Sequence, residues 1–130
     1  RNLLKGDILI NSTGVGTAGR VTLFELYGDF VVDSHVTIVR LNKEKALPKF
    51  VLYSLAHIGF KNIEKMAVGQ SGQIVLSLSI INNIKIPLPS ITEQSKIVSE
   101  IEKIEIKIAE FTKQLANIAS EKNAILKKYL

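Results

Sequence analysis

Residues 90–130 contain neither glycine nor proline, and this uninterrupted stretch constrains the fold more than any other feature of the sequence. Ser90 and Glu93 fit a capping box, in which the serine hydroxyl and the glutamate carboxylate each bond an amide that the first helical turn leaves exposed. The stretch therefore predicts one helix of about 40 residues, roughly 60 Å long. A domain built from the preceding residues is too small to cover such a helix along its length.

The apolar residues of this helix recur in steps of four and three, which is the repeat of a coiled coil. A single amphipathic helix lying on its own domain is the alternative, but most of the stripe would then stay in water, and burial is worth about 0.8 kcal/mol for each CH₂ group. A partner helix is the better explanation, with Lys122 inside the stripe fixing its register. The predicted helix interface consists of Ile97, Ile101, Ile104, Ile108, Phe111, Leu115, Ile118 and Ile125.

Residues 1–46 consist of short β-like runs separated by glycine-containing segments. Apolar and β-branched residues surround a loop at 14–19 and resume after Gly28, which predicts strand, loop, strand, turn and strand in an antiparallel meander. Pro48 suits the first turn of a short apolar helix, and Gly59 suits its end.

A second short helix at 60–67, a Gly/Ser/Gln loop at 68–77 and an extended segment at 84–89 complete the predicted domain. The fold class is therefore predicted as α+β. We divide the chain into a partial β-rich domain at 1–89 and one long helix at 90–130.

Gly14, Gly16 and Gly19 match the Gly-x-Gly-x-x-Gly pattern of dinucleotide-binding proteins, and they follow the apolar run Ile8–Ile10. That pattern holds a pyrophosphate only where a helix begins inside it. The residues after Gly19 are β-branched and aromatic instead. We predict that this loop joins two antiparallel strands and binds no nucleotide, and we expect no cofactor.

Composition limits the partners that the chain can have. It has no cysteine and no apolar run of about 18 residues, so we expect a cytoplasmic protein without disulfides, metal thiolates or a membrane span. It starts on Arg1 and enters a strand almost at once, from which we expect a missing N-terminal part. Residues 1–90 carry ten Lys and Arg against six Asp and Glu, a net charge of +4. This excess favours a polyanionic partner.

The sequence contains no recognisable catalytic motif. His35 and His57 fall in different predicted elements, and there is no P-loop, nucleophile elbow or metal-ligand cluster. Two polar glycine loops, at 11–20 and 69–73, remain. Gln pairs with adenine, Arg and Lys with guanine, and Ser and Thr with either base or with phosphate, although solvated turn residues are the alternative. The predicted DNA contacts are Ser12, Thr13, Thr17, Arg20, Lys61, Gln70, Ser71 and Gln73.

The order of these motifs resembles that of the DNA-specificity (S) subunits of type I restriction–modification systems. Here "KGDILINSTGVGTAGRV" precedes "VGQSGQIVLSLSIINNIKIPLPSITEQSKIVSEIEKI", and in that family a strand-loop-strand likewise precedes an "IPLP…EQ" junction and a long helix. The residues that match the family pattern are Gly6, Asp7, Ile8, Gly19, Arg20, Gly69, Gly72, Leu78, Ile84, Ile86, Pro87, Leu88, Pro89, Glu93, Gln94, Ile97 and Val98.

The resemblance implies a non-catalytic subunit whose target-recognition domain reads one half of a split double-stranded DNA site. It also implies long helices that set the half-site spacing and dock methyltransferase subunits, in a complex that an endonuclease joins. Family S subunits have two recognition domains and two antiparallel long helices, whereas this chain has one of each, so an antiparallel homodimer through the long helix is predicted. A fused restriction enzyme–methyltransferase and a coiled-coil protein-binding adaptor remain the alternatives.

Overall fold

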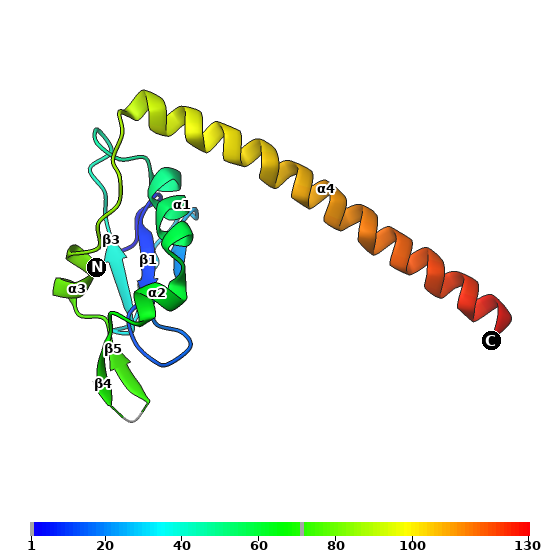
Figure 1. The fold of residues 1–130 in the computed structure, drawn as a ribbon, viewed down its shortest axis with the longest axis horizontal. Coiled ribbons are helices and arrows are strands. Elements are labelled where there is room, and N and C mark those ends of the chain that lie inside the picture. The colour runs from blue at the N-terminus through cyan, green and yellow to red at the C-terminus, as the bar shows by residue number, and fades with distance from the viewer. Residues whose placement is uncertain (1, 71) are drawn as a thin grey trace. The chain divides into compact units, whose positions relative to one another are not determined.

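The computed structural model describes residues 2–70 and 72–130, traced in Figure 1. The chain divides into two compact units, Arg1–Ser95 and Lys96–Leu130. The first unit contains short strands and helices, and the second is the greater part of one long helix, α4 (Ile91–Tyr129). The predicted α+β class is confirmed.

A three-stranded antiparallel sheet forms the centre of the first unit. Its strands are β1 (Ile8–Asn11), β2 (Val21–Leu23) and β3 (Val36–Val39), in the order β2-β1-β3. Ile8 lies opposite Leu23 on one side and opposite Val39 on the other. The predicted meander is therefore wrong in its third strand, which pairs with β1 and not with β2.

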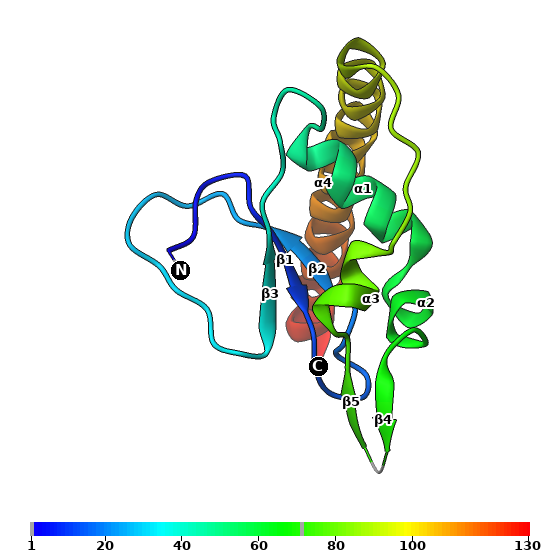
Figure 2. The same cartoon turned by 90° about the vertical axis from the view of Figure 1, so that its left-hand side faces the viewer.

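The directions of the strands explain this correction. Because β2 and β3 are both antiparallel to β1, they run in the same direction, and a tight turn cannot join strands that run in the same direction. Residues 24–35 form a long connection instead, visible beside β3 in Figure 2. β1 takes the central place because Ile8 and Ile10 are fully buried, whereas no residue of β2 or β3 is.

The core lies on the face of the sheet to which Ile8 and Ile10 point. Side chains alternate along a strand, so these two isoleucines share one face. α1 (Pro48–Ile58) and α2 (Phe60–Glu64) supply further buried residues, among them Phe50 and Ile63. Full burial of each such side chain contributes about 1.5–3 kcal/mol.

Gly59 separates α1 from α2, as the sequence predicts. Its φ of +84° is a conformation that residues with a side chain rarely adopt, and its amide donates to the Leu55 carbonyl to close α1. Pro48 occupies the first turn of α1, where a missing amide hydrogen does no harm. Both predicted helices are present, although α2 ends at Glu64, three residues before the predicted end at 67.

Residues 68–70 and 73–75 pair as a hairpin where the sequence predicts a loop. β4 (Val68–Gln70) pairs with β5 (Gln73–Val75), so the loop prediction is wrong for these residues. Val68 faces Val75 across the pair, and such β-branched pairs stabilise a two-stranded ribbon in spite of the glycines near its tip. A short helix, α3 (Leu78–Asn82), follows and is capped by the Ser77 hydroxyl.

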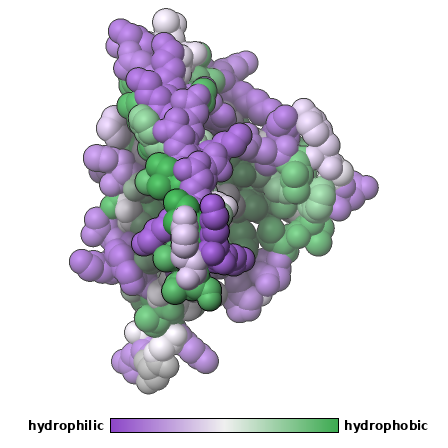
Figure 3. Space-filling model, turned by 90° about the vertical axis from the view of Figure 1, so that its right-hand side faces the viewer, coloured by the Kyte–Doolittle hydropathy of each residue, from purple (hydrophilic) through white to green (hydrophobic). Residues whose placement is uncertain are grey.

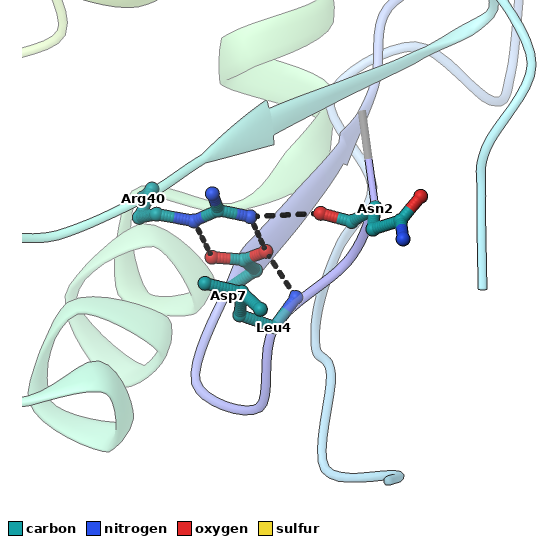
Figure 4. Close-up of polar contacts among 4 residues, drawn as sticks. All are labelled: Asn2, Leu4, Asp7 and Arg40. Carbon is teal, nitrogen blue, oxygen red and sulfur yellow. Dashed lines mark hydrogen bonds and ion pairs between the residues drawn. The ribbon is translucent and has the colours of Figure 1, made fainter. Parts of the chain in front are cut away.

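An ion pair fixes the start of the sheet (Figure 4). Asp7 is 2% exposed, and its two carboxylate oxygens accept hydrogen bonds from Nε and Nη2 of Arg40 at 2.8 and 2.7 Å. The Leu4 amide also donates to Asp7, and Arg40 reaches the Asn2 carbonyl. The Arg40 guanidinium holds the pKa of the Asp7 carboxyl below its usual value.

The start of α4 is bonded to the first unit through Gln94, which is fully buried. Its side-chain oxygen accepts from the Leu47 amide, and its nitrogen donates to the carbonyls of Lys45 and Pro89, all at 2.8–2.9 Å. The predicted capping box precedes it. The Ser90 hydroxyl and amide both donate to the Glu93 carboxylate, which lowers the pKa of Glu93. The Glu93 amide donates in turn to the Ser90 hydroxyl.

Beyond Ser95, α4 exposes its apolar stripe. Every predicted interface residue lies on this helix and is exposed except Ile101, which is half-buried. Ile104 is 57% exposed and Phe111 is 62% exposed. Figure 3, viewed from the side at which α4 ends, shows hydrophobic groups at the surface beside hydrophilic ones. Among the described helices, none has both the length and the apolar content that crossing a bilayer requires.

Candidate nucleic-acid interface

The glycine loop connects β1 to β2, as predicted. Asn11 and Arg20 close it: the Asn11 amide donates to the Arg20 carbonyl, and the Gly19 amide donates to the Asn11 carbonyl. Gly14, Gly16 and Gly19 all have φ between +80° and +87°. Residues 16–19, all within the described part of the chain, start no helix, so the arrangement that a dinucleotide pyrophosphate needs is not formed at this loop.

The β4–β5 hairpin lies beside the glycine loop and is hydrogen-bonded to it (Figure 2). The Gly14 amide donates to the Ile74 carbonyl at 3.1 Å, and the Leu76 amide donates to the Ser12 carbonyl at 2.8 Å. Thr13 and Val75 form an isolated antiparallel bridge between these two bonds. Two segments that lie far apart in the sequence are thereby joined side by side.

Gln70 and Gln73 stand opposite each other at the tip of the hairpin. Residues directly opposite on an antiparallel pair project to the same face, so the two amides lie together, and both residues are exposed. Gly69 makes the close pairing possible, because a Cβ atom there would lie 2.0 Å from the Gln73 carbonyl oxygen. The predicted contact Ser71 lies outside the described residues.

Two cationic side chains lie close to the Phe60 ring, at the base of the glycine loop. The guanidinium of Arg20 lies 5.4 Å from the centre of the Phe60 ring, and the ammonium of Lys61 lies 5.0 Å from it. Both basic residues are exposed. Contact with the ring restrains their long side chains, which otherwise lose more conformational freedom on binding a ligand.

The predicted hydroxyl contacts differ in exposure. Ser12 is buried, and its hydroxyl donates to the His35 carbonyl at 2.9 Å. The Thr13 hydroxyl bonds Nδ1 of His35 at 2.8 Å. Thr17 is exposed, and its hydroxyl donates to the Thr13 and Gly14 carbonyls, which leaves its lone pairs for an outside donor. The sequence gives no local signal for the involvement of His35.

Glu64 is a further residue that the sequence does not point to. One of its carboxylate oxygens accepts the Gly16 amide, and the other lies 3.5 Å from the Lys61 ammonium. Only 13% of its side chain is exposed. The Lys61–Glu64 spacing predicts a helical ion pair, but nothing local predicts the contact with a loop 48 residues away.

We call residues 12–20, 60–65, 68–70 and 72–75 the loop–hairpin surface. Its ionised side chains are Arg20, Lys61, Lys65 and Glu64, so its charge is positive. Amide, hydroxyl and guanidinium groups on such a surface can bond base edges and phosphates, whereas acid–base or metal chemistry needs convergent titratable groups. Among residues 2–70 and 72–130, no three His, Asp, Glu or Cys side chains gather as a metal site.

The sequence matches the family described as the type I restriction modification DNA specificity domain, over residues 1–120. The chain belongs to this family. The resemblance carried by the glycine loop and the "IPLP…EQ" junction is thus confirmed, and the junction now has a structural reason in the buried bonds of Gln94.

Two curated relatives show the same relationship. The chain is 30% identical over 132 residues to the "Putative type I restriction enzyme MjaX specificity subunit" of Methanocaldococcus jannaschii. This match covers 97% of this chain and 30% of that protein. The chain is also 30% identical over 102 residues to the "Putative type I restriction enzyme specificity subunit S.HindORF215P" of Haemophilus influenzae, covering 78% of this chain and 24% of that protein. The chain therefore spans less than a third of the length of either relative.

Proposed function

We propose that this chain is a DNA-reading module of a type I restriction–modification system. In this proposal residues 1–89 form a non-catalytic recognition domain for one half of a split DNA site, and residues 90–130 form the helix that assembles the complex. One observation supports it above all. In a member of the DNA specificity family, backbone bonds join the two polar glycine segments into one exposed, basic surface.

The chemistry of the loop–hairpin surface suits the edges of base pairs. Gln70 and Gln73 present two neighbouring amides, each able to pair bidentately with adenine, and Arg20 can pair with guanine or hold a phosphate. A two-stranded ribbon fits the major groove, and the β4–β5 hairpin is such a ribbon. Lys61, Thr13, Thr17 and Ser71 add phosphate or base contacts in the proposal, while the buried Ser12 shapes the loop.

The helix α4 supplies the assembly function. Its exposed apolar stripe would be covered by a partner helix, and we propose that this partner is an antiparallel second copy of the chain. Such a pair would place two recognition domains at its opposite ends. Such a homodimer suits a palindromic split site. The methyltransferase and endonuclease subunits of the system would bind the assembled helices and domains.

The experiment that tests the function starts from the chain co-expressed with a type I methyltransferase subunit. The purified complex is incubated with a pool of random duplex DNA, and bound molecules are amplified and sequenced. The proposal expects one split sequence to be enriched over successive rounds. A complex that forms but enriches no sequence would refute DNA reading and favour the coiled-coil adaptor.

A further inference from the structure

We propose that Glu64 is a positioning residue that sets the sequence specificity of the glycine loop. Its carboxylate holds the loop in one conformation, and its negative charge opposes non-specific binding to phosphate. This inference rests on the proposed DNA-reading function. Glu64 acts through the loop and through Lys61, since both its oxygens are engaged within the protein and little of its side chain reaches solvent.

Close packing fixes the base of the loop, and this packing does not extend to its outer part. A Cβ atom at Gly19 would lie 2.8 Å from the Phe60 carbonyl oxygen and 3.0 Å from the Ile63 Cβ, so the backbone rests directly on α2. A Cβ atom at Gly16 would meet nothing within 4 Å. The contact from Glu64 to the Gly16 amide therefore bonds the outer part of the loop to α2, in addition to the bond from Gly14 to the hairpin.

The bond joins a charged acceptor to a glycine amide in a conformation that most residues avoid. Gly16 has φ +80°, and a glycine there is intrinsically free to adopt several backbone conformations. A hydrogen bond to an ionised group is worth about twice a neutral one, which suits the task of selecting one conformation. Thr17 follows directly, so its position depends on that choice.

An acid on this surface also needs an explanation of its own. Residues 12–20 and 60–75 contain Arg20, Lys61, Lys65 and no acid other than Glu64. A carboxylate near DNA phosphates is repelled by them, and this one also pairs with Lys61, so it weakens binding that depends on phosphate alone. Weak non-specific binding together with an ordered loop raises the ratio of specific to non-specific affinity.

Two substitutions separate the two roles. Glu64→Gln removes the charge and keeps an oxygen that accepts the Gly16 amide, whereas Glu64→Ala removes both. In the complex with the methyltransferase, both variants should bind random duplex DNA about three- to tenfold more tightly at low salt, with a steeper salt dependence. The specificity ratio, measured with the selected and a scrambled duplex, should fall about tenfold or more beyond this in Glu64→Ala only.

A second readout needs no DNA. Exchange of the Gly16 amide hydrogen, followed by NMR, should become faster in Glu64→Ala and stay near the wild-type rate in Glu64→Gln. Glu25→Gln is the matched control, since Glu25 is an exposed acid that follows β2 at the end of the sheet opposite to the glycine loop. It should change neither the exchange nor the specificity ratio.

The outcomes distinguish this inference from the function on which it rests. A wild-type complex that enriches no sequence overturns the function and the specificity role together. If the wild type discriminates but Glu64→Ala leaves both readouts unchanged, or if Gln lowers the ratio as far as Ala does, the positioning role is wrong. A changed base preference in Glu64→Gln would show direct base reading by Glu64 and would likewise overturn it.

Discussion

The two units of this chain differ in how far they bury their apolar side chains. In the described part of the chain, all the buried hydrophobic side chains lie between Leu3 and Ile81, and the buried residue of α4 is the polar Gln94. The first unit thus buries an apolar core, and it also exposes large apolar residues such as Tyr27 and Leu78. The helix carries a regular stripe of apolar residues in water, which we propose is covered by another molecule.

The contrast extends to polar residues. In the first unit, polar and charged side chains such as Asp7 and Glu64 are held by bonds to residues far away in the sequence. On α4 beyond Ser95, the Thr112 hydroxyl donates locally, to the Ile108 carbonyl one turn earlier. A domain whose polar groups are fixed suits recognition, whereas an exposed apolar stripe suits assembly.

The largest expected effect comes from placing charge in the helix stripe. Replacing both Ile104 and Ile108 with Asp would bury two carboxylates in a paired helix, which costs several kcal/mol unless they find partners. The double variant should sediment as a monomer, and circular dichroism should show the first unit still folded. Ile106→Asp with Ala109→Asp is the matched control, because these residues lie off the stripe and should leave association unchanged.

That prediction also has a clear point of failure. If the unmutated chain sediments as a monomer at high micromolar concentration, the antiparallel homodimer is wrong. The partner of the stripe is then a different protein, and the methyltransferase is the first to test by co-sedimentation.

The next effect should be confined to the first unit. Asp7→Asn weakens the two charge-assisted bonds to Arg40 and should lower the free energy of unfolding by about 2–3 kcal/mol, with helix association unaffected. Denaturant titration followed by circular dichroism measures it. Asp29→Asn, at an exposed position in the 24–35 connection, is the control and should leave stability within about 0.5 kcal/mol.

The same pair predicts a pH dependence. The pKa of Asp7 is lowered in the folded state, so the folded protein releases this proton more readily than the unfolded chain. The stabilisation is fully present above the ordinary aspartate pKa of 3.8 and is lost as the pH falls through the lower folded value. Wild-type stability should therefore fall over this acid range more steeply than that of Asp7→Asn, and parallel curves would contradict the account.

The smallest expected effect concerns DNA and not stability. Arg20→Ala and Gln70→Ala should each weaken binding to the selected sequence by about 1–3 kcal/mol where a base contact is lost. A lost phosphate contact would instead weaken all sequences alike and lower the salt dependence. Fluorescence anisotropy with selected and scrambled duplexes separates these cases, with Gln114→Ala on exposed α4 as the control. Unchanged affinities in both variants would remove these residues from the site.

Local sequence signals predicted α4, both helices around Gly59 and the glycine loop, because caps, helix stops and apolar repeats are properties of neighbouring residues. Pairing between distant segments left no such signal. The β-like run at 36–39 could have joined either earlier strand, and only the three-dimensional arrangement selects β1. The pairing of residues 68–70 with 73–75 was missed because Gly69 and Gly72 disfavour strands on propensity alone, while the pairing depends on the flanking valines.

In the loop–hairpin surface, too, local residue types were predictable and contacts between distant segments were not. Residue types in the two polar loops pointed to DNA, but their junction depends on the bond from Gly14 to Ile74, and the hold on the loop depends on Glu64. Neither contact has a sequence pattern. His35 and Phe60 became relevant for the same reason, since each meets a loop residue only in the folded domain.

Hydrogen–deuterium exchange of the assembled complex, with and without the selected duplex, tests most directly whether the loop–hairpin surface reads DNA. The account predicts that peptides covering residues 12–20 and 60–75 take up deuterium more slowly when the selected duplex is bound, and that a scrambled duplex has a much smaller effect. Protection confined to the 24–35 connection, with 12–20 and 60–75 unchanged, would contradict it.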